Sequence, residues 1–145
     1  MEHALNMKFI ALASVGIGNI DVDYAKERGI LVINTPGKNT NSAAELTMGL
    51  MLSAIRNIVR ADQNMRSCSW DRHRFTGIEL LNKTLGIIGL GNVGHRFARF
   101  ALAFDMKVLV FDPYIAYEVF ERHNVQKVDW ETLLGTSESF PSVFP

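Results

Sequence analysis

Three glycines at fixed spacing, Gly89, Gly91 and Gly94, form the pattern in this 145-residue chain that most clearly indicates chemistry. They follow an apolar run at Lys83–Ile88, which has the length of a buried parallel strand, and they precede apolar residues at helical spacing up to Phe104. In such a turn the first glycine permits a sharp bend, the second leaves room for a pyrophosphate, and the third lets the helix pack closely. The start of the helix also offers unpaired N–H groups to an anion.

An acidic residue, Asp112, follows the next apolar run, Lys107–Phe111, which we expect to be a second strand. In a dinucleotide-binding fold, a carboxylate at this point accepts hydrogen bonds from the ribose hydroxyls of adenosine and repels a 2′-phosphate. The pattern therefore predicts an NAD site rather than an NADP site. The alternative is a glycine turn in an α/β protein without a ligand, but strand, turn, helix, strand and acid all fall in register.

The composition excludes several other functions. The formal net charge is +0 at pH 7, so no basic excess points to nucleic acid. No apolar run reaches the roughly 18 residues of a membrane helix, and the run at Met7–Ala13 is better explained as a strand than as a signal peptide. Cys68 is the single cysteine, which excludes an internal disulfide and a cysteine-cluster metal site. We expect a cytoplasmic setting.

The chain before the glycine turn predicts two short strands and two helices. The strands are expected at Lys8–Ala13 and Ile30–Ile33. A helix between them, Val22–Arg28, would be capped by Asp21 and ended by Gly29. After a turn at 34–39, Ser42 and Glu45 have the spacing of a capping box. A long helix is expected from Ser42 to Arg66, apolar on most faces as far as Ile58, so it needs burial against the chain or a second copy.

Beyond Asp112 the chain predicts shorter elements. We expect a helix near Ala116–Arg122, a strand near Val125–Val128 and a helical turn at Trp130–Leu134. Asp129 would cap that turn and Gly135 would end it. The remainder, as far as Pro145, contains two prolines and no periodicity, and is therefore expected to be irregular.

Taken together, these residues resemble the D-isomer-specific 2-hydroxyacid dehydrogenases, and within them the D-3-phosphoglycerate dehydrogenase branch. Three stretches carry the resemblance: Ser14–Asp21, Asn34–Leu46, and Lys83–Gly91 with Asp112-Pro113. The resemblance implies an α/β fold. It would comprise the end of a flavodoxin-like substrate domain, Met1–Pro36, and the first half of a Rossmann-like NAD-binding domain, Gly37–Leu134. An irregular tail, Gly135–Pro145, would follow.

The resemblance also assigns site residues. Backbone amides of Ser14, Val15 and Gly16 would face the carboxylate of a small 2-hydroxy or 2-keto acid, and Val15 would also lie near the nicotinamide. Asn92 and Val93 match the pair whose backbone meets the pyrophosphate, between Gly91 and Gly94. Asp112 matches the ribose acid. The helix that begins at Ser42 matches one through which members of the family form homodimers.

No catalytic residue is predicted within the chain. The family's arginine, glutamate and histidine lie downstream of the ribose acid, beyond Pro145, so the chain is expected to be a fragment inactive in hydride transfer on its own. The local histidines are His3, His73, His95 and His123, and we expect surface roles for them, with His123 a cation at a helix end. No two have the spacing of a metal site.

Two other functions remain as alternatives. One is a non-catalytic NAD(H)-sensing regulator built on the same scaffold, which would retain the glycine turn and Asp112. The other is a different Rossmann enzyme such as adenosylhomocysteinase, against which the turn at Asn34-Thr35-Pro36 and its following helix argue.

Overall fold

A computed structural model describes residues 6–71 and 73–136, and it divides into two compact units between Asn41 and Ser42. The terminus around His3 and residues 137–145 of the expected tail lie outside the described residues.

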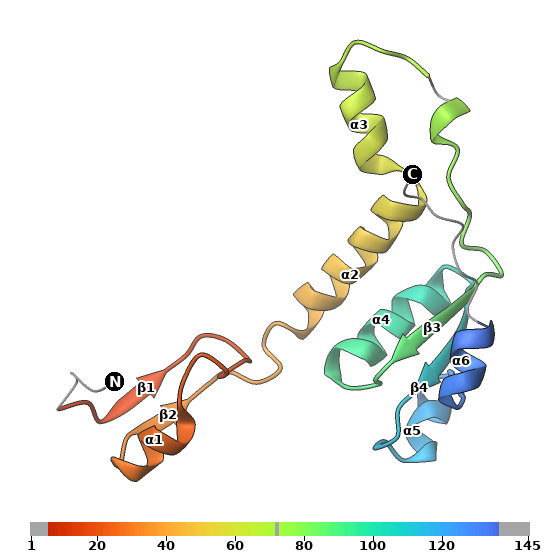
Figure 1. The fold of residues 1–145 in the computed structure, drawn as a ribbon. Coiled ribbons are helices and arrows are strands. Elements are labelled where there is room, and N and C mark those ends of the chain that lie inside the picture. Colours follow the sequence, from red (N-terminus) through yellow and green to blue (C-terminus); the bar gives the residue numbers. More distant parts are fainter. Residues whose placement is uncertain (1–5, 72, 137–145) are drawn as a thin grey trace. The chain divides into compact units, whose positions relative to one another are not determined.

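The first unit contains two parallel strands joined by a helix (Figure 1). Strand β1 (Phe9–Ala11) pairs with β2 (Leu31–Ile33), and α1 (Val22–Glu27) lies between them in the chain. The predicted cap is confirmed, because Asp21 Oδ1 accepts a hydrogen bond from the Tyr24 N–H at 3.0 Å. The predicted stop is confirmed as well, since Gly29 adopts φ +67° directly after the helix.

The second unit is built on a three-stranded parallel sheet in the order β3-β4-β5. Two helices make its crossovers and a third follows the last strand. Figure 1 shows α4 on one side of β3 and β4 and α6 on the other. This alternation of parallel strands and helices confirms the Rossmann-like fold that the sequence predicts. The elements are β3 (Thr84–Ile88), α4 (Asn92–Ala103), β4 (Lys107–Phe111), α5 (Tyr117–Arg122), β5 (Gln126–Lys127) and α6 (Trp130–Thr136).

The core of the second unit surrounds strand β4. Val108, Leu109 and Val110 are all buried, and because successive side chains of a strand point to opposite faces, both faces of β4 are covered. Phe120 of α5 and Ala98 of α4 belong to the same buried cluster. Continuous burial of this kind explains why the strand appears in the sequence as an unbroken apolar run.

Helix α2 (Thr40–Ile55) begins before the predicted capping box, so that prediction is wrong. Ser42 lies inside the helix, and Thr40 instead donates its hydroxyl hydrogen bond to the Gly37 carbonyl at 2.9 Å. A hydroxyl two positions earlier therefore secures the chain at the helix start. Leu46 and Leu50 are 64% and 62% exposed, so the apolar excess of this helix is not buried within the described residues.

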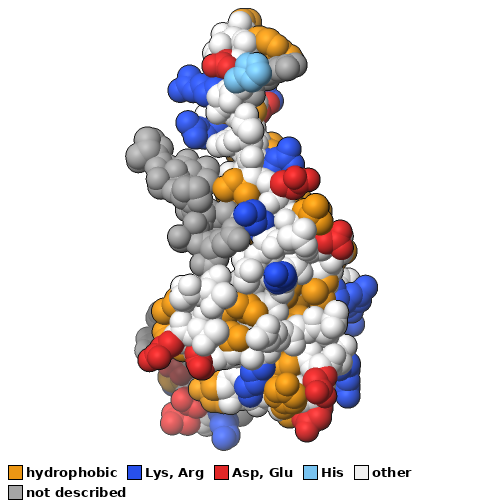
Figure 2. Space-filling model, turned by 90° about the vertical axis from the view of Figure 1, so that its right-hand side faces the viewer, with side chains coloured by type: hydrophobic (Ala, Val, Ile, Leu, Met, Phe, Trp, Pro, Cys, Tyr) orange, Lys and Arg blue, Asp and Glu red, His pale blue; other side chains and the backbone are white. Residues whose placement is uncertain are grey.

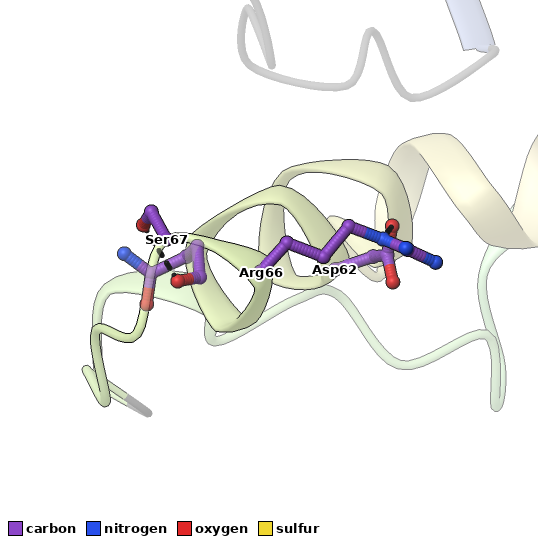
Figure 3. Close-up of polar contacts among 4 residues, drawn as sticks. Asp62, Arg66 and Ser67 are labelled. Carbon is purple, nitrogen blue, oxygen red and sulfur yellow. Dashed lines mark hydrogen bonds and ion pairs between the residues drawn. The ribbon is translucent and has the colours of Figure 1, made fainter.

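The prediction of one continuous helix as far as Arg66 is also wrong. Asn57 adopts a left-handed conformation at φ 55°, which asparagine tolerates better than most residues, and a separate helix α3 (Ile58–Arg66) follows. Figure 3 shows the polar contacts of α3: Arg66 Nε donates to Asp62 Oδ2 at 2.8 Å, and the Ser67 hydroxyl donates to the Asn64 carbonyl at 2.7 Å. Both contacts are exposed, so they contribute little to stability.

Helix α6 is longer than predicted. Asp129 caps it as expected, because its Oδ1 accepts a hydrogen bond from the Thr132 N–H at 2.7 Å. Gly135 does not end it, and the helix continues to Thr136. Burial of Leu133 and an edge-on contact between Trp130 and Phe111, with ring centroids 5.4 Å apart, hold the helix on the sheet. The stabilisation from this packing exceeds the roughly 1 kcal/mol that a glycine inside a helix costs.

The surface carries no single-sign patch on the face drawn in Figure 2, where acidic and basic side chains are interspersed. None of the helices in the described part of the chain combines the length and the apolar character that crossing a lipid bilayer requires.

Gly94 sets how closely α4 approaches the end of β3. A Cβ atom on Gly94 would lie 2.1 Å from the Gly89 carbonyl oxygen, which is far inside van der Waals contact. Gly91 is different, since a Cβ placed there meets no atom within 4 Å. The close helix packing predicted for the third glycine of the motif is therefore confirmed.

We predict that Gly94→Ala destabilises the second unit by about 1–3 kcal/mol or more, because α4 must move away from the turn. Gly91→Ala is the matched control and should change the free energy of unfolding by less than about 0.5 kcal/mol. Urea unfolding followed by circular dichroism measures both. Equal stabilities for the two variants would contradict the packing role of Gly94.

Candidate functional site

The glycine turn connects the end of β3 to the start of α4. Gly89 adopts φ +90°, a conformation that residues with a side chain rarely reach, and its N–H donates to the Phe111 carbonyl at 2.9 Å. The tight bend predicted for the first glycine is thus confirmed. Gly91 is the N-cap residue of α4, and the space where its Cβ would stand is open. A ligand can therefore approach the backbone here without meeting a side chain.

The first turn of α4 presents backbone N–H groups that no side chain caps. The first hydrogen bond of the helix runs from the His95 N–H to the Gly91 carbonyl at 3.1 Å. The N–H groups of Asn92, Val93 and Gly94 precede it, so they have no partner within the helix. Asn92 and Val93 are also exposed. Together with the helix dipole, these amides form a site for a phosphate or another anion.

Asp112 lies directly beside this turn. Its side chain is only 7% exposed, and Oδ2 accepts a hydrogen bond from the Leu90 N–H at 2.8 Å. Oδ1 accepts hydrogen bonds from Tyr114 at 2.9 Å and from Ile115 at 3.3 Å. The carboxylate therefore joins the turn after β3 to the turn after β4. Sequence reasoning missed these bonds, although an aspartate that accepts from the following backbone is a common turn arrangement.

These hydrogen bonds also fix the charge of the site. The N–H groups of Leu90 and Tyr114 hold the pKa of the Asp112 carboxyl below its ordinary value, against the opposing effect of burial. Asp112 is therefore ionised at neutral pH. Among residues 6–71 and 73–136, one N–H is bonded to Oδ2, so this oxygen keeps a lone pair for a further donor such as a ribose hydroxyl.

The predicted substrate loop lies in the first unit, where two separate motifs meet. The Ser14 carbonyl accepts a hydrogen bond from the Thr35 N–H at 3.0 Å, and the Val15 carbonyl accepts one from Asn34 Nδ2 at 2.8 Å. The Ser14 hydroxyl donates to the Gly16 carbonyl at 2.9 Å. Carbonyl groups thus anchor the loop, while none of the hydrogen bonds in the described residues uses the N–H groups of Ser14, Val15 or Gly16.

The histidines differ from expectation at one point. His123 ends α5, but it is half-buried and its ring stacks on that of His95, with centroids 5.0 Å apart. Burial, and then the charges of His95, Arg122 and Arg99, lower its pKa below the ordinary value. The expected cation at a helix end is therefore wrong, because desolvation and neighbouring positive groups outweigh the helix dipole. His73 is exposed in the short 3-10 turn His73–Phe75.

Comparison with known proteins agrees with this geometry. A sequence model of the D-isomer specific 2-hydroxyacid dehydrogenase NAD-binding domain matches residues 48–145. The chain is 50% identical over 129 residues to D-3-phosphoglycerate dehydrogenase of Methanocaldococcus jannaschii, an alignment that covers 89% of this chain and 25% of that protein. It is also 50% identical over 113 residues to hydroxypyruvate reductase of Thermotoga maritima, covering 78% of this chain and 37% of that protein.

The structure is similar to a crystal structure of D-lactate dehydrogenase from Aquifex aeolicus complexed with NAD and lactic acid. The TM-score is 0.77 at 33% sequence identity, over 90% of this chain and 39% of that one. The chain thus spans a quarter to two fifths of the length of these relatives. The expected cofactor, NAD, is confirmed by the family match. With its glycine turn, its uncapped helix start and its matched NAD-binding domain, the chain belongs to the D-isomer-specific 2-hydroxyacid dehydrogenase family.

Proposed function

We propose that this chain holds NAD(H) on the turn Gly89–Gly94 and on Asp112, as part of an enzyme that oxidises or reduces a D-2-hydroxy acid at C2. The observation that carries the proposal is the 2.8 Å hydrogen bond between Leu90 and Asp112, which brings the acid beside the open backbone at Gly91. An anion site and a carboxylate adjoin here, as the diphosphate and ribose of a dinucleotide require.

Each part of the site has a separate task. The N–H groups of Asn92 and Val93 bind the diphosphate, and the absence of a Cβ at Gly91 allows it to come close. The free lone pair of Asp112 Oδ2 accepts a ribose hydroxyl, and its negative charge disfavours a 2′-phosphate. A bound NAD would supply hydride-transfer chemistry at C2 of the substrate.

The substrate is proposed to bind through its carboxylate. The carbonyls of Ser14 and Val15 accept hydrogen bonds from Thr35 and Asn34, which holds the loop and leaves the N–H groups of Ser14, Val15 and Gly16 available to an anion. We assign Met1–Pro36 to the end of a substrate domain and Gly37–Leu134 to part of the NAD-binding domain. The relatives' names include phosphoglycerate and hydroxypyruvate, whose shared element is a carboxylate next to an oxygen-bearing C2.

Proton transfer to or from the C2 oxygen is proposed to depend on a residue outside the described ranges. His95 and His123 stack on each other, and His95 also bonds to the Gly91 carbonyl, so neither is arranged as an isolated acid or base. We therefore expect the 145-residue chain to bind the dinucleotide without turning over substrate by itself.

We further propose that two copies associate through α2. Leu46 and Leu50 are one helical turn apart, and both are more than half exposed. Two such leucines on one face of a helix form a seam that a second copy can cover.

Gly91→Val should weaken NADH binding by about 100-fold or more, which corresponds to about 2.8 kcal/mol, because the new side chain fills the approach to the amides. Fluorescence titration with NADH measures the dissociation constant. The melting temperature serves as the control, since the structure has room for the side chain in the absence of ligand. A stable variant that keeps wild-type affinity would show that the phosphate binds elsewhere.

Asp112→Asn should reduce the preference for NADH over NADPH by about tenfold or more, because a charge-assisted hydrogen bond to ribose is lost and the repulsion of a 2′-phosphate disappears. The matched control is Asp105→Asn, the same change at an exposed residue whose φ of 56° asparagine also tolerates. Both dissociation constants are measured for each variant. Equal losses of affinity for NADH and NADPH would show that Asp112 only holds the backbone and does not contact the ribose.

The double substitution Leu46→Glu with Leu50→Glu should convert a dimer to a monomer, because burying two carboxylates in the seam costs several kcal/mol. Light scattering after gel filtration gives the mass. The control is Leu134→Glu, a similarly exposed leucine on α6 that should leave the mass unchanged. Identical masses for wild type and the α2 variant would refute this interface.

A further inference from the structure

His95 is hydrogen-bonded to Gly91, the N-cap residue of helix α4. Its ring nitrogen Nδ1 lies 2.9 Å from the Gly91 carbonyl oxygen, and its backbone N–H bonds to the same oxygen at 3.1 Å. Because a carbonyl can only accept, Nδ1 carries the hydrogen and donates it. The imidazole ring is therefore fixed within one helical turn of the amides at Asn92 and Val93.

A second imidazole ring, that of His123, stacks on the ring of His95. The rings of His95 and His123 are stacked at 5.0 Å between centroids and 26° between planes, and this contact joins α4 to α5. The other charged groups acting on His123 are Arg99 from α4 and Arg122 from α5, so its charged neighbours are all cationic or become cationic. In the ligand-free protein these charges and burial oppose protonation of His123.

We propose that His95 and His123 form a coupled pair that takes up a proton when the diphosphate of a dinucleotide binds at the start of α4, so that affinity rises as the pH falls. This inference rests on the proposed function and adds a pair of residues that position and sense the diphosphate. Protonation places a positive charge next to the anion, and the anion offsets the repulsion that opposes protonation of His123 in the free protein.

The direction of the pH dependence follows from a comparison of the free and the NADH-bound protein. Burial and nearby cations lower the pKa of His123 in the free protein, and a bound anion raises it again. Binding and protonation therefore favour each other by the same factor. Affinity is lowest above the bound pKa, increases as the pH falls, and levels off below the free pKa. Other groups stay constant, because the phosphates of NADH are diesters and the pKa of Asp112 is held low.

The test measures the dissociation constant of NADH for the full chain between pH 8.5 and pH 6 at fixed ionic strength. Wild type should bind about three- to tenfold more tightly at the acidic end, as expected for one partly screened charge near an anion. His123→Phe keeps a ring for the stack, and His95→Asn keeps a donor for the Gly91 carbonyl, but neither titrates. Each should reduce the pH dependence at least by half.

His73→Asn is the matched control, because it removes an exposed histidine of the same unit and should preserve the wild-type slope. The histidine ring resonances give a second readout, in which the pKa of His123 rises on addition of NADH. A pH-independent affinity in wild type, or an unchanged slope in His123→Phe, would overturn the inference while leaving the proposed function intact. Absence of NADH binding at every pH would instead overturn the proposed function, and this inference with it.

Discussion

The carboxylate of Asp112 accepts hydrogen bonds from three backbone N–H groups, and the geometry of the nucleotide site depends on them. The bond to Leu90 crosses from the end of β4 to the turn after β3, so it fixes two loops that are far apart in sequence. Charge-assisted hydrogen bonds of this kind are among the stronger interactions available to a buried group. The open backbone at Gly91 keeps its place because the neighbouring residue is held.

Much of this fold could be predicted from the sequence, because its strands and helices obey strong periodicities. The apolar run Lys107–Phe111 became β4 without a shift in either boundary, and Asp21 and Asp129 cap the helices assigned to them. The errors occurred where several local signals compete. Two hydroxyl residues stand near the start of α2, and the helical pattern alone gives no sign that Asn57 will adopt a left-handed conformation.

The site was predictable in its residue types but not in its bonding. Spacing identifies the glycines and Asp112, because each glycine position of the motif has its own steric requirement. It does not reveal that the Asp112 carboxylate is bonded to the Leu90 amide, which depends on how two turns meet, or that His95 and His123 stack, which depends on how α5 lies beside α4. The link from Asn34 to the Val15 carbonyl was similarly invisible, although both motifs had been recognised separately.

Asp112 accepts a hydrogen bond from Leu90 and is also the residue proposed to bind the ribose. This combination has a consequence for redesign of coenzyme preference. In many dinucleotide enzymes, exchange of the acid for a neutral or basic residue is an obvious first step toward a phosphorylated coenzyme. Here exchange for a basic residue, which has no acceptor, would leave the Leu90 amide without its side-chain partner, at a cost of roughly 1–3 kcal/mol. An engineer would first have to supply a new acceptor for Leu90, and only afterwards recruit an arginine. In the proposed site, the same carboxylate of Asp112 binds the ribose and holds the turn after β3.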